Sequence, residues 1–303
     1  MDLTAYRAIE ANRWRSRLLA GVNAAVLACL FALAVWIVGP DALRPVSLLV
    51  IFIGSALFGS REVVLVLLGA RELAPDEEKR LFRRLDVIRV GIGRRALPSV
   101  HLVVSPYPNA LAIERVGQTG TLVVTNRLLD LDDDELDSVL AHEMFHLASA
   151  VVGLRSLMAL LRGLVMSLVT TQVLWHRLAL AAVVVFAVVA LGPAAIAFVL
   201  FAAMYLIAEA WISQQREYLA DAQAVLIARH PEALIRALRR MSTADVFAES
   251  IAPRANSISG DGERLAASLW TVRPPNMRAS LVTRLFDAHP STEDRIRRLT
   301  RMS

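Results

Sequence analysis

Cysteine and lysine are almost absent from this chain of 303 residues. Cys29 is the only cysteine and lies inside an apolar run, and Lys79 is the only lysine. A single cysteine cannot form a disulfide bond within the chain, nor can it build a metal site from several thiolates. Any metal ion must therefore be held by histidine, aspartate or glutamate.

Charged side chains are also scarce, and apolar ones are abundant. Apolar residues make up 56% of the chain and the mean hydropathy is +0.50, which exceeds the usual apolar fraction of a soluble domain and indicates a membrane protein. The net charge of +5 comes from arginines that flank the apolar segments. This arrangement suits the anionic face of a bilayer better than nucleic acid. We therefore expect the lipid bilayer as a partner and no binding of nucleic acid.

Four apolar segments are predicted to cross the membrane as two hairpins, because a helix needs about 20 apolar residues to span a bilayer. The third segment is the weakest because it contains Arg162. A cleaved signal peptide is the alternative interpretation of the first segment, but the apolar run continues past the small-residue site at 32–34 and a second run follows at once. The four segments are residues 18–38, 46–68, 156–175 and 178–207.

A soluble unit is predicted on both sides of the second hairpin. An amphipathic helical pattern, "ELAPDEEKRLFRRLDVI", precedes three strand-like stretches, "SVHLVVS", "NALAIE" and "TLVVTN". Helical patterns resume at Glu209. We expect an α+β domain that is mostly helical with a small antiparallel sheet. Along the chain, the prediction is a cytoplasmic segment 1–17, a hairpin 18–68, a first half-domain 69–150, a hairpin 151–208 and a second half-domain 209–303.

Two histidines stand four residues apart in the helical pattern "DLDDDELDSVLAHEMFHLAS". His142 and His146 at this spacing lie on one face of a helix, so both imidazoles can reach a single Zn²⁺. Glu143 projects beside them, where it can act on a metal-bound water. The alternative is that both histidines are ordinary buried or half-exposed side chains. The spacing favours a zinc hydrolase.

A catalytic zinc needs a third protein ligand and an open position. In "QREYLADAQAVLIA", Glu217 and Asp221 share one predicted helix face, so Glu217 could bind zinc while Asp221 accepts a hydrogen bond from a liganding imidazole. A solvated polar face is the alternative, which the upstream histidine motif disfavours. Glu209 is the rival ligand, but it directly follows the apolar run and has only Ser213 at the same spacing. We therefore predict Glu217 as the third ligand.

The motifs "HEMFH", "REYLADA" and "DAHPSTEDRIRRL", in this order and with a hairpin between the first two, resemble the HtpX-type membrane zinc metallopeptidases and the CAAX prenyl proteases of the same group. The resemblance covers roughly residues 18–300 and implies a zincin-like domain with one zinc ion per chain. It implies zinc ligands at His142, His146 and Glu217, the general base at Glu143 and a supporting carboxylate at Asp221. It further implies a histidine that stabilises the tetrahedral intermediate at His289, a catalytic-motif arginine at Arg295, and a substrate-binding edge strand at Asn109, Ala110, Leu111 and Ala112.

The last three assignments have alternatives in the residues themselves. His289 precedes a proline and a Ser-x-x-Asp start, so it could simply shape a helix N-terminus. Arg295 is one of several arginines on the same helical pattern and could belong to a solvated face. The strand 109–112 could be plain core sheet, although Pro106 and Pro108 just before it favour an edge.

The resemblance implies a multi-pass membrane endopeptidase of the bacterial cell membrane that acts in quality control of membrane proteins. A CAAX-type processing protease is one alternative, but it would require a chamber and more membrane helices. A non-catalytic scaffold or sensor with a degenerate metal site is the other, and the intact set of His and Glu residues counts against it. Arginines cluster before the first apolar segment and after the second, which predicts an active site and both termini on the cytoplasmic side.

Overall fold

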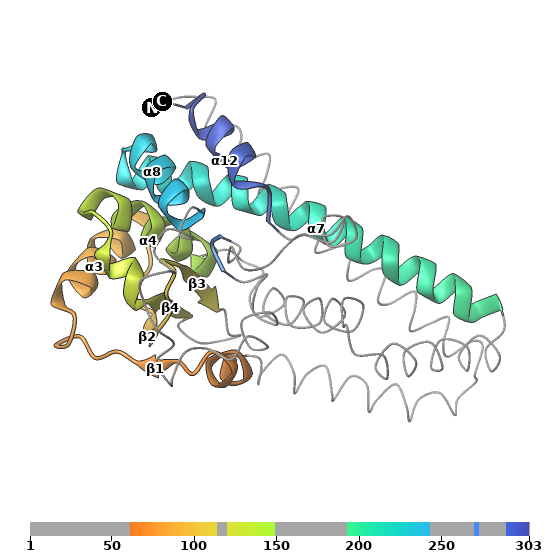
Figure 1. Ribbon diagram of the computed structural model, residues 1–303, viewed down its shortest axis with the longest axis horizontal. Helices are drawn as coiled ribbons and strands as arrows, with labels where there is room; N and C mark the ends of the chain where they lie inside the picture. The colour runs from red at the N-terminus through yellow and green to blue at the C-terminus, as the bar shows by residue number, and fades with distance from the viewer. Residues whose placement is uncertain (1–60, 114–119, 149–192, 243–269, 273–288, 303) are drawn as a thin grey trace.

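The computed structural model describes residues 61–113, 120–148, 193–242, 270–272 and 289–302 (Figure 1). The predicted membrane segments 18–38 and 156–175 lie outside these ranges, as do most of 46–68 and the first half of 178–207. Within the described ranges, no helix combines the length and the hydropathy needed to cross a membrane. The number of membrane crossings therefore stays a prediction.

The described part of the chain is mostly helical, as expected, and contains one small sheet (Figure 1). The longest helix extends well beyond the other described elements, and its C-terminal part packs against the two helices that follow it. The helices are α3 (Lys79–Ile92), α4 (Asp133–Ala148), α7 (Pro193–Ala228), α8 (Pro231–Ser242) and α12 (Thr292–Leu299), with a 3-10 helix η2 (Asn126–Asp130). The strands are β1 (Arg71–Glu72), β2 (Ser99–Val103), β3 (Ala110–Ile113) and β4 (Thr121–Thr125).

The sheet is mixed, which corrects the expectation of an antiparallel sheet. Its strand order is β1-β2-β4-β3, and β2 pairs with β4 in parallel while the other two pairs are antiparallel. The chain reverses direction between β2 and β3 and again between β3 and β4, so β2 and β4 run the same way. They become neighbours because β4 enters the sheet between the two earlier strands. All its residues are buried, so a central position satisfies both its side chains and its main-chain groups.

Strand β3 lies at one edge of the sheet, as the prolines before it predicted. Within the described ranges, Trp270–Val272 lies along its outer side, where Leu111 forms an antiparallel bridge with Trp270. The alternation along β3 sends Ala110 and Ala112 to one face of the sheet and Leu111 and Ile113 to the other.

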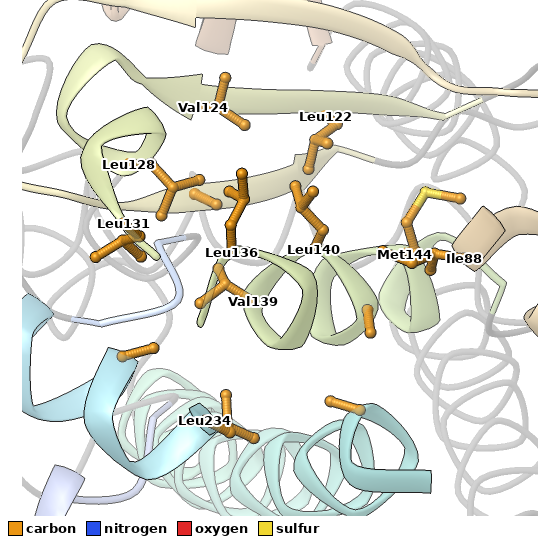
Figure 2. Close-up of a cluster of buried hydrophobic side chains, with 14 of the residues drawn as sticks. Ile88, Leu122, Val124, Leu128, Leu131, Leu136, Val139, Leu140, Met144 and Leu234 are labelled. Carbon is orange, nitrogen blue, oxygen red and sulfur yellow. The ribbon is translucent and has the colours of Figure 1, made fainter. Parts of the chain in front are cut away.

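Helix α4 lies between the sheet and the pair formed by α7 and α8. Figure 2 shows Leu136 and Leu140 of α4 pointing toward Leu122 and Val124 of β4. Acidic residues fill the first turn of α4, where they interact favourably with the positive end of the helix dipole. Because 11 of the 16 residues of this helix are buried, its position is fixed from both sides, and the motif that it carries is held in place.

The opposite face of the sheet is buried as well. Helical residues 61–67 and the segment that follows them supply Val64, Leu65 and Leu68, which pack with Trp270 against this face. The strands contribute Val103, Leu111, Ile113 and Val123 to the same cluster.

Candidate active site

His142 and His146 lie on the second half of α4, and both are buried. Their Nε2 atoms are 3.1 Å apart, which confirms that the four-residue spacing places both imidazoles on one face of the helix.

Glu217 reaches the two histidines from α7, the helix that packs along α4. Its Oε2 atom is 3.3 Å from His142 Nε2, and its Oε1 atom is 3.3 Å from His146 Nε2. Ligands of a tetrahedral zinc lie 2.0–2.2 Å from the ion, so neighbouring ligand atoms stand about 3.4 Å apart. The observed separations match this value within a few tenths of an ångström. The three side chains therefore fit one tetrahedral metal ion.

Asp221 lies one helical turn beyond Glu217 and contacts the far side of the first imidazole. Its Oδ1 atom is 2.9 Å from His142 Nδ1. A proton on Nδ1 that is donated to this carboxylate leaves the Nε2 lone pair of the neutral ring for a metal. The structure thus brings Asp221 to the position expected of a carboxylate that orients a ligand.

Burial and charge act in opposite directions on the titration of this cluster. Burial alone would lower the pKa of His142, but its hydrogen bonds to Asp221 and Glu217 raise the pKa to about 9. Burial likewise favours a neutral Glu217, yet the charges of His289 and His146 hold the pKa of its carboxyl well below the ordinary value. Glu217 is therefore anionic, and a metal that bound His142 would have to displace a proton.

Glu143 follows the first histidine and is fully buried at the centre of the site. Its Oε1 atom is 3.9 Å from His142 Nε2 and 2.6 Å from Thr271 Oγ1. Within the part of the chain that the structure describes, its Oε2 atom has no hydrogen-bond partner. A buried carboxylate beside three side chains that could hold a metal, with one oxygen uncommitted, can accept a proton from water.

Arg295 is 1% exposed, so the solvated-face alternative is wrong for this residue. Its guanidinium binds Asp221 side-on, with Nη2 2.6 Å from Oδ1 and Nε 2.9 Å from Oδ2. Its Nη1 atom donates to the main-chain oxygen of Thr271 at 2.6 Å. Arg295 therefore stands behind Asp221 and holds that carboxylate against His142.

His289 is buried and faces the same cluster, with Nδ1 3.4 Å from Glu217 Oε2. The N-terminus of α12 is capped by another residue, since Ser291 Oγ accepts a hydrogen bond from the Asp294 main-chain nitrogen. His289 thus lies beside the third ligand, and the cap that was its alternative role belongs to Ser291.

The predicted substrate strand lies next to the site and contacts a segment that the sequence did not single out. Asn109 Nδ2 donates to the Val272 main-chain oxygen at 2.7 Å, and Ala110 O accepts from the Thr271 main-chain nitrogen at 2.8 Å. Leu111 faces Trp270, whereas Ala112 is buried toward α4. Thr271 carries no sequence signal, because it lies in a stretch without periodicity or a motif.

Comparisons with known proteins agree with this geometry. A model of peptidase family M48 matches residues 75–303. A protease HtpX homolog from Dictyoglomus thermophilum is 30% identical over 314 residues, which cover 99% of this chain and 95% of the relative. HtpX homologs from Tropheryma whipplei and Salinibacter ruber are each 31% identical and cover 81% and 82% of this chain and 80% and 84% of their own lengths. The crystal structure of S. mikatae Ste24p is 15% identical with a TM-score of 0.46, over 97% of this chain and 67% of that one, a likeness too low to carry weight.

Proposed function

This chain belongs to peptidase family M48, and we propose that it is a zinc-dependent endopeptidase in which Glu143 is the general base. One observation carries the proposal: His142, His146 and Glu217 converge at the separations of a tetrahedral zinc, with the Glu143 carboxylate buried beside them. The donor set of two imidazoles and one carboxylate is that of a hydrolytic zinc site, which keeps a position for water.

Each residue of the site has its own proposed role in hydrolysis. Zinc, when bound, would supply a positive charge that acidifies water and polarises a peptide carbonyl. Glu143 accepts a proton from the attacking water and returns it to the leaving amine as the C–N bond breaks and a C–O bond forms. Asp221, clamped by Arg295, keeps the His142 ring in one orientation and one tautomer. His289 lies beside Glu217, where it can donate a hydrogen bond to the oxygen that becomes negative.

The outer edge of β3 is the proposed binding surface for the substrate main chain. An extended peptide added to this edge would pair with Ala110 and come next to Glu143. Main-chain pairing depends little on the sequence of the peptide, which suits a protease with many protein substrates.

Membrane location and a role in quality control of membrane proteins form the finer part of the proposal. Large apolar side chains are exposed within the predicted membrane segments and just after the last one: Val66 is 79% exposed, Met204 69% and Trp211 61%. Exposed apolar side chains at these positions are expected where a helix enters lipid. They support a lipid bilayer as partner and membrane proteins as substrates.

Metal analysis and casein cleavage of purified protein test the enzyme assignment. We expect one zinc ion per chain and cleavage by the wild type. Glu143→Gln should keep zinc and lose about 100- to 10,000-fold in rate, because an amide cannot accept the proton. Glu232→Gln, which makes the same change at an exposed position on α8, is the matched control and should match the wild type. Cleavage by metal-replete Glu143→Gln, or a wild type with neither zinc nor activity, would refute the assignment.

A further inference from the structure

The segment Trp270–Val272 occupies the edge of β3 where the substrate is proposed to bind. Its main chain is held at three successive points. These contacts do not depend on which side chains the segment itself carries. The Thr271 nitrogen donates to Ala110 O at 2.8 Å, Arg295 Nη1 donates to Thr271 O at 2.6 Å, and the Asn109 side chain pairs with both the nitrogen and the oxygen of Val272. These are contacts that an extended peptide would make along a sheet edge.

The Thr271 hydroxyl lies next to the proposed general base, Glu143. Its Oγ1 atom is 2.6 Å from Glu143 Oε1 and 2.8 Å from Ala110 O. This is the distance at which a general base holds the oxygen whose proton it takes. With this segment in place, His142 and Glu143 are 0% exposed and Glu217 is 1% exposed. A substrate that approaches Glu143 Oε1 must take the place of the Thr271 hydroxyl, which contacts this oxygen.

The Trp270 side chain fills an apolar pocket next to this edge. It is 2% exposed and belongs to the cluster on the face of the sheet opposite α4, bounded by Val64, Leu65, Leu68, Leu111, Ile113 and Val123. Within the described ranges, the indole Nε1 donor has no hydrogen-bond partner. Burying a donor without an acceptor is unfavourable, so the pocket is better matched to a side chain that is large and wholly apolar.

We propose that this pocket is the subsite for a bulky apolar side chain of the substrate, and that Trp270–Val272 holds the place of a substrate strand until a substrate displaces it. The inference rests on the proposed endopeptidase function and deepens it by naming a substrate class. Main-chain contacts at Asn109, Ala110 and Arg295 accept any extended peptide, and the pocket selects phenylalanine, leucine or methionine over small or charged residues.

Position-scanned quenched peptides test the subsite. We expect kcat/KM to rise at least about 10-fold when alanine is replaced by phenylalanine or leucine at one position beside the scissile bond, and to fall when aspartate stands there. Trp270→Ala should raise kcat/KM for the good peptides by about 10-fold, because it weakens the hold of the internal segment. Val87→Ala shortens an apolar side chain at an exposed site on α3 and should change nothing. Zinc content and thermal unfolding identify a variant that fails to fold.

A disulfide lock tests displacement even if Trp270→Ala is unstable. Leu111 and Trp270 lie directly opposite each other in an antiparallel bridge, and such pairs have the Cβ separation that a disulfide needs. In a Cys29→Ser background, Leu111→Cys with Trp270→Cys should be inactive when oxidised and active after reduction with a phosphine. Equal activity in both states, or a flat peptide preference in a wild type that cleaves casein, would overturn the inference and leave the enzyme assignment intact. A wild type that cleaves no substrate would instead refute the enzyme assignment on which the inference depends.

Discussion

The Asp221 carboxylate bridges the imidazole of His142 and the guanidinium of Arg295. One oxygen, Oδ1, is 2.9 Å from His142 Nδ1 and 2.6 Å from Arg295 Nη2, and all three side chains are buried. The coulombic effect of Arg295 and the hydrogen bond from His142 outweigh burial and lower the pKa of Asp221. The carboxylate that contacts the His142 ring on α4 is therefore held by an arginine on α12.

Asp221→Ala should weaken zinc binding by about 10- to 100-fold, because the liganding ring loses the group that orients it. It should also destabilise the fold by about 3–5 kcal/mol, since Arg295 is left buried without its anion. Zinc affinity by competition with a chelating dye and unfolding in urea measure the two effects.

The double variant Asp221→Ala with Arg295→Met separates the two effects. Removing the orphaned cation should recover most of the stability, because replacing a whole buried ion pair by apolar groups is often neutral. It should not restore zinc affinity. If the double variant is as unstable as Asp221→Ala alone, the broken Asp221–Arg295 ion pair does not account for the loss of stability.

Glu217→Ala should lose zinc and proteolysis together, because it removes the carboxylate that contacts both histidines at 3.3 Å. Glu209→Ala, two helical turns earlier on α7, should keep one zinc ion per chain. Metal analysis of the two purified variants compares them directly. Zinc retained by Glu217→Ala and lost from Glu209→Ala would reverse the assignment of the third ligand.

Replacing each of two glycines with alanine should change the stability of the fold in opposite directions. A Cβ atom on Gly91 in α3 would meet Ile227 Cγ2 at an ordinary 3.6 Å, so Gly91→Ala should stabilise the fold by about 0.5 kcal/mol through helix propensity. A Cβ atom on Gly120 would lie 2.4 Å from Leu147 Cδ2 and 3.3 Å from Ile113 O. Gly120→Ala should therefore destabilise by about 1–3 kcal/mol. Unfolding of both variants in denaturant measures the change in the free energy of unfolding. A change of the same sign in both variants would contradict the packing argument.

A reporter fused after Ser303 tests the proposed cytoplasmic location. His142 and Glu217 meet at one site, so the chain between them must cross the membrane an even number of times. Arg7, Arg13, Arg15 and Arg17 precede the first apolar segment, and basic residues stay on the cytoplasmic side. We expect green fluorescent protein to be bright and alkaline phosphatase to be inactive at this position. Active phosphatase would place the domain outside.

The grouping of the proposed metal ligands could be predicted because its signal is local. His142 with His146, and Glu217 with Asp221, are pairs at i and i+4, and a helix turns that spacing into a shared face whatever its tertiary surroundings. Strand β4 illustrates the opposite case. Its apolar sequence predicts a strand, but its partners depend on where the chain re-enters the sheet, and its own residues do not encode this. The antiparallel expectation failed for that reason.

Thr271 could not be predicted, for a related reason. Its main-chain nitrogen donates to Ala110 O and its main-chain oxygen accepts from Arg295, and every residue type except proline offers the same main-chain groups. Arg295 belonged to a recognisable motif, but the sequence did not reveal that its partner would be Asp221. That pairing joins residues 74 positions apart.

The distance along the chain between His142 and Arg295 also has a consequence for biosynthesis. Arg295 follows His142 by 153 residues. At a ribosomal rate of 5–20 residues per second, the α4 histidines are made roughly 8 to 30 seconds before the arginine that fixes Asp221. During that interval the nascent chain gains Glu217 and Asp221 but lacks the α12 residue that clamps the Asp221 carboxylate. The side-chain cluster around His142 is therefore complete only after translation has passed Arg295.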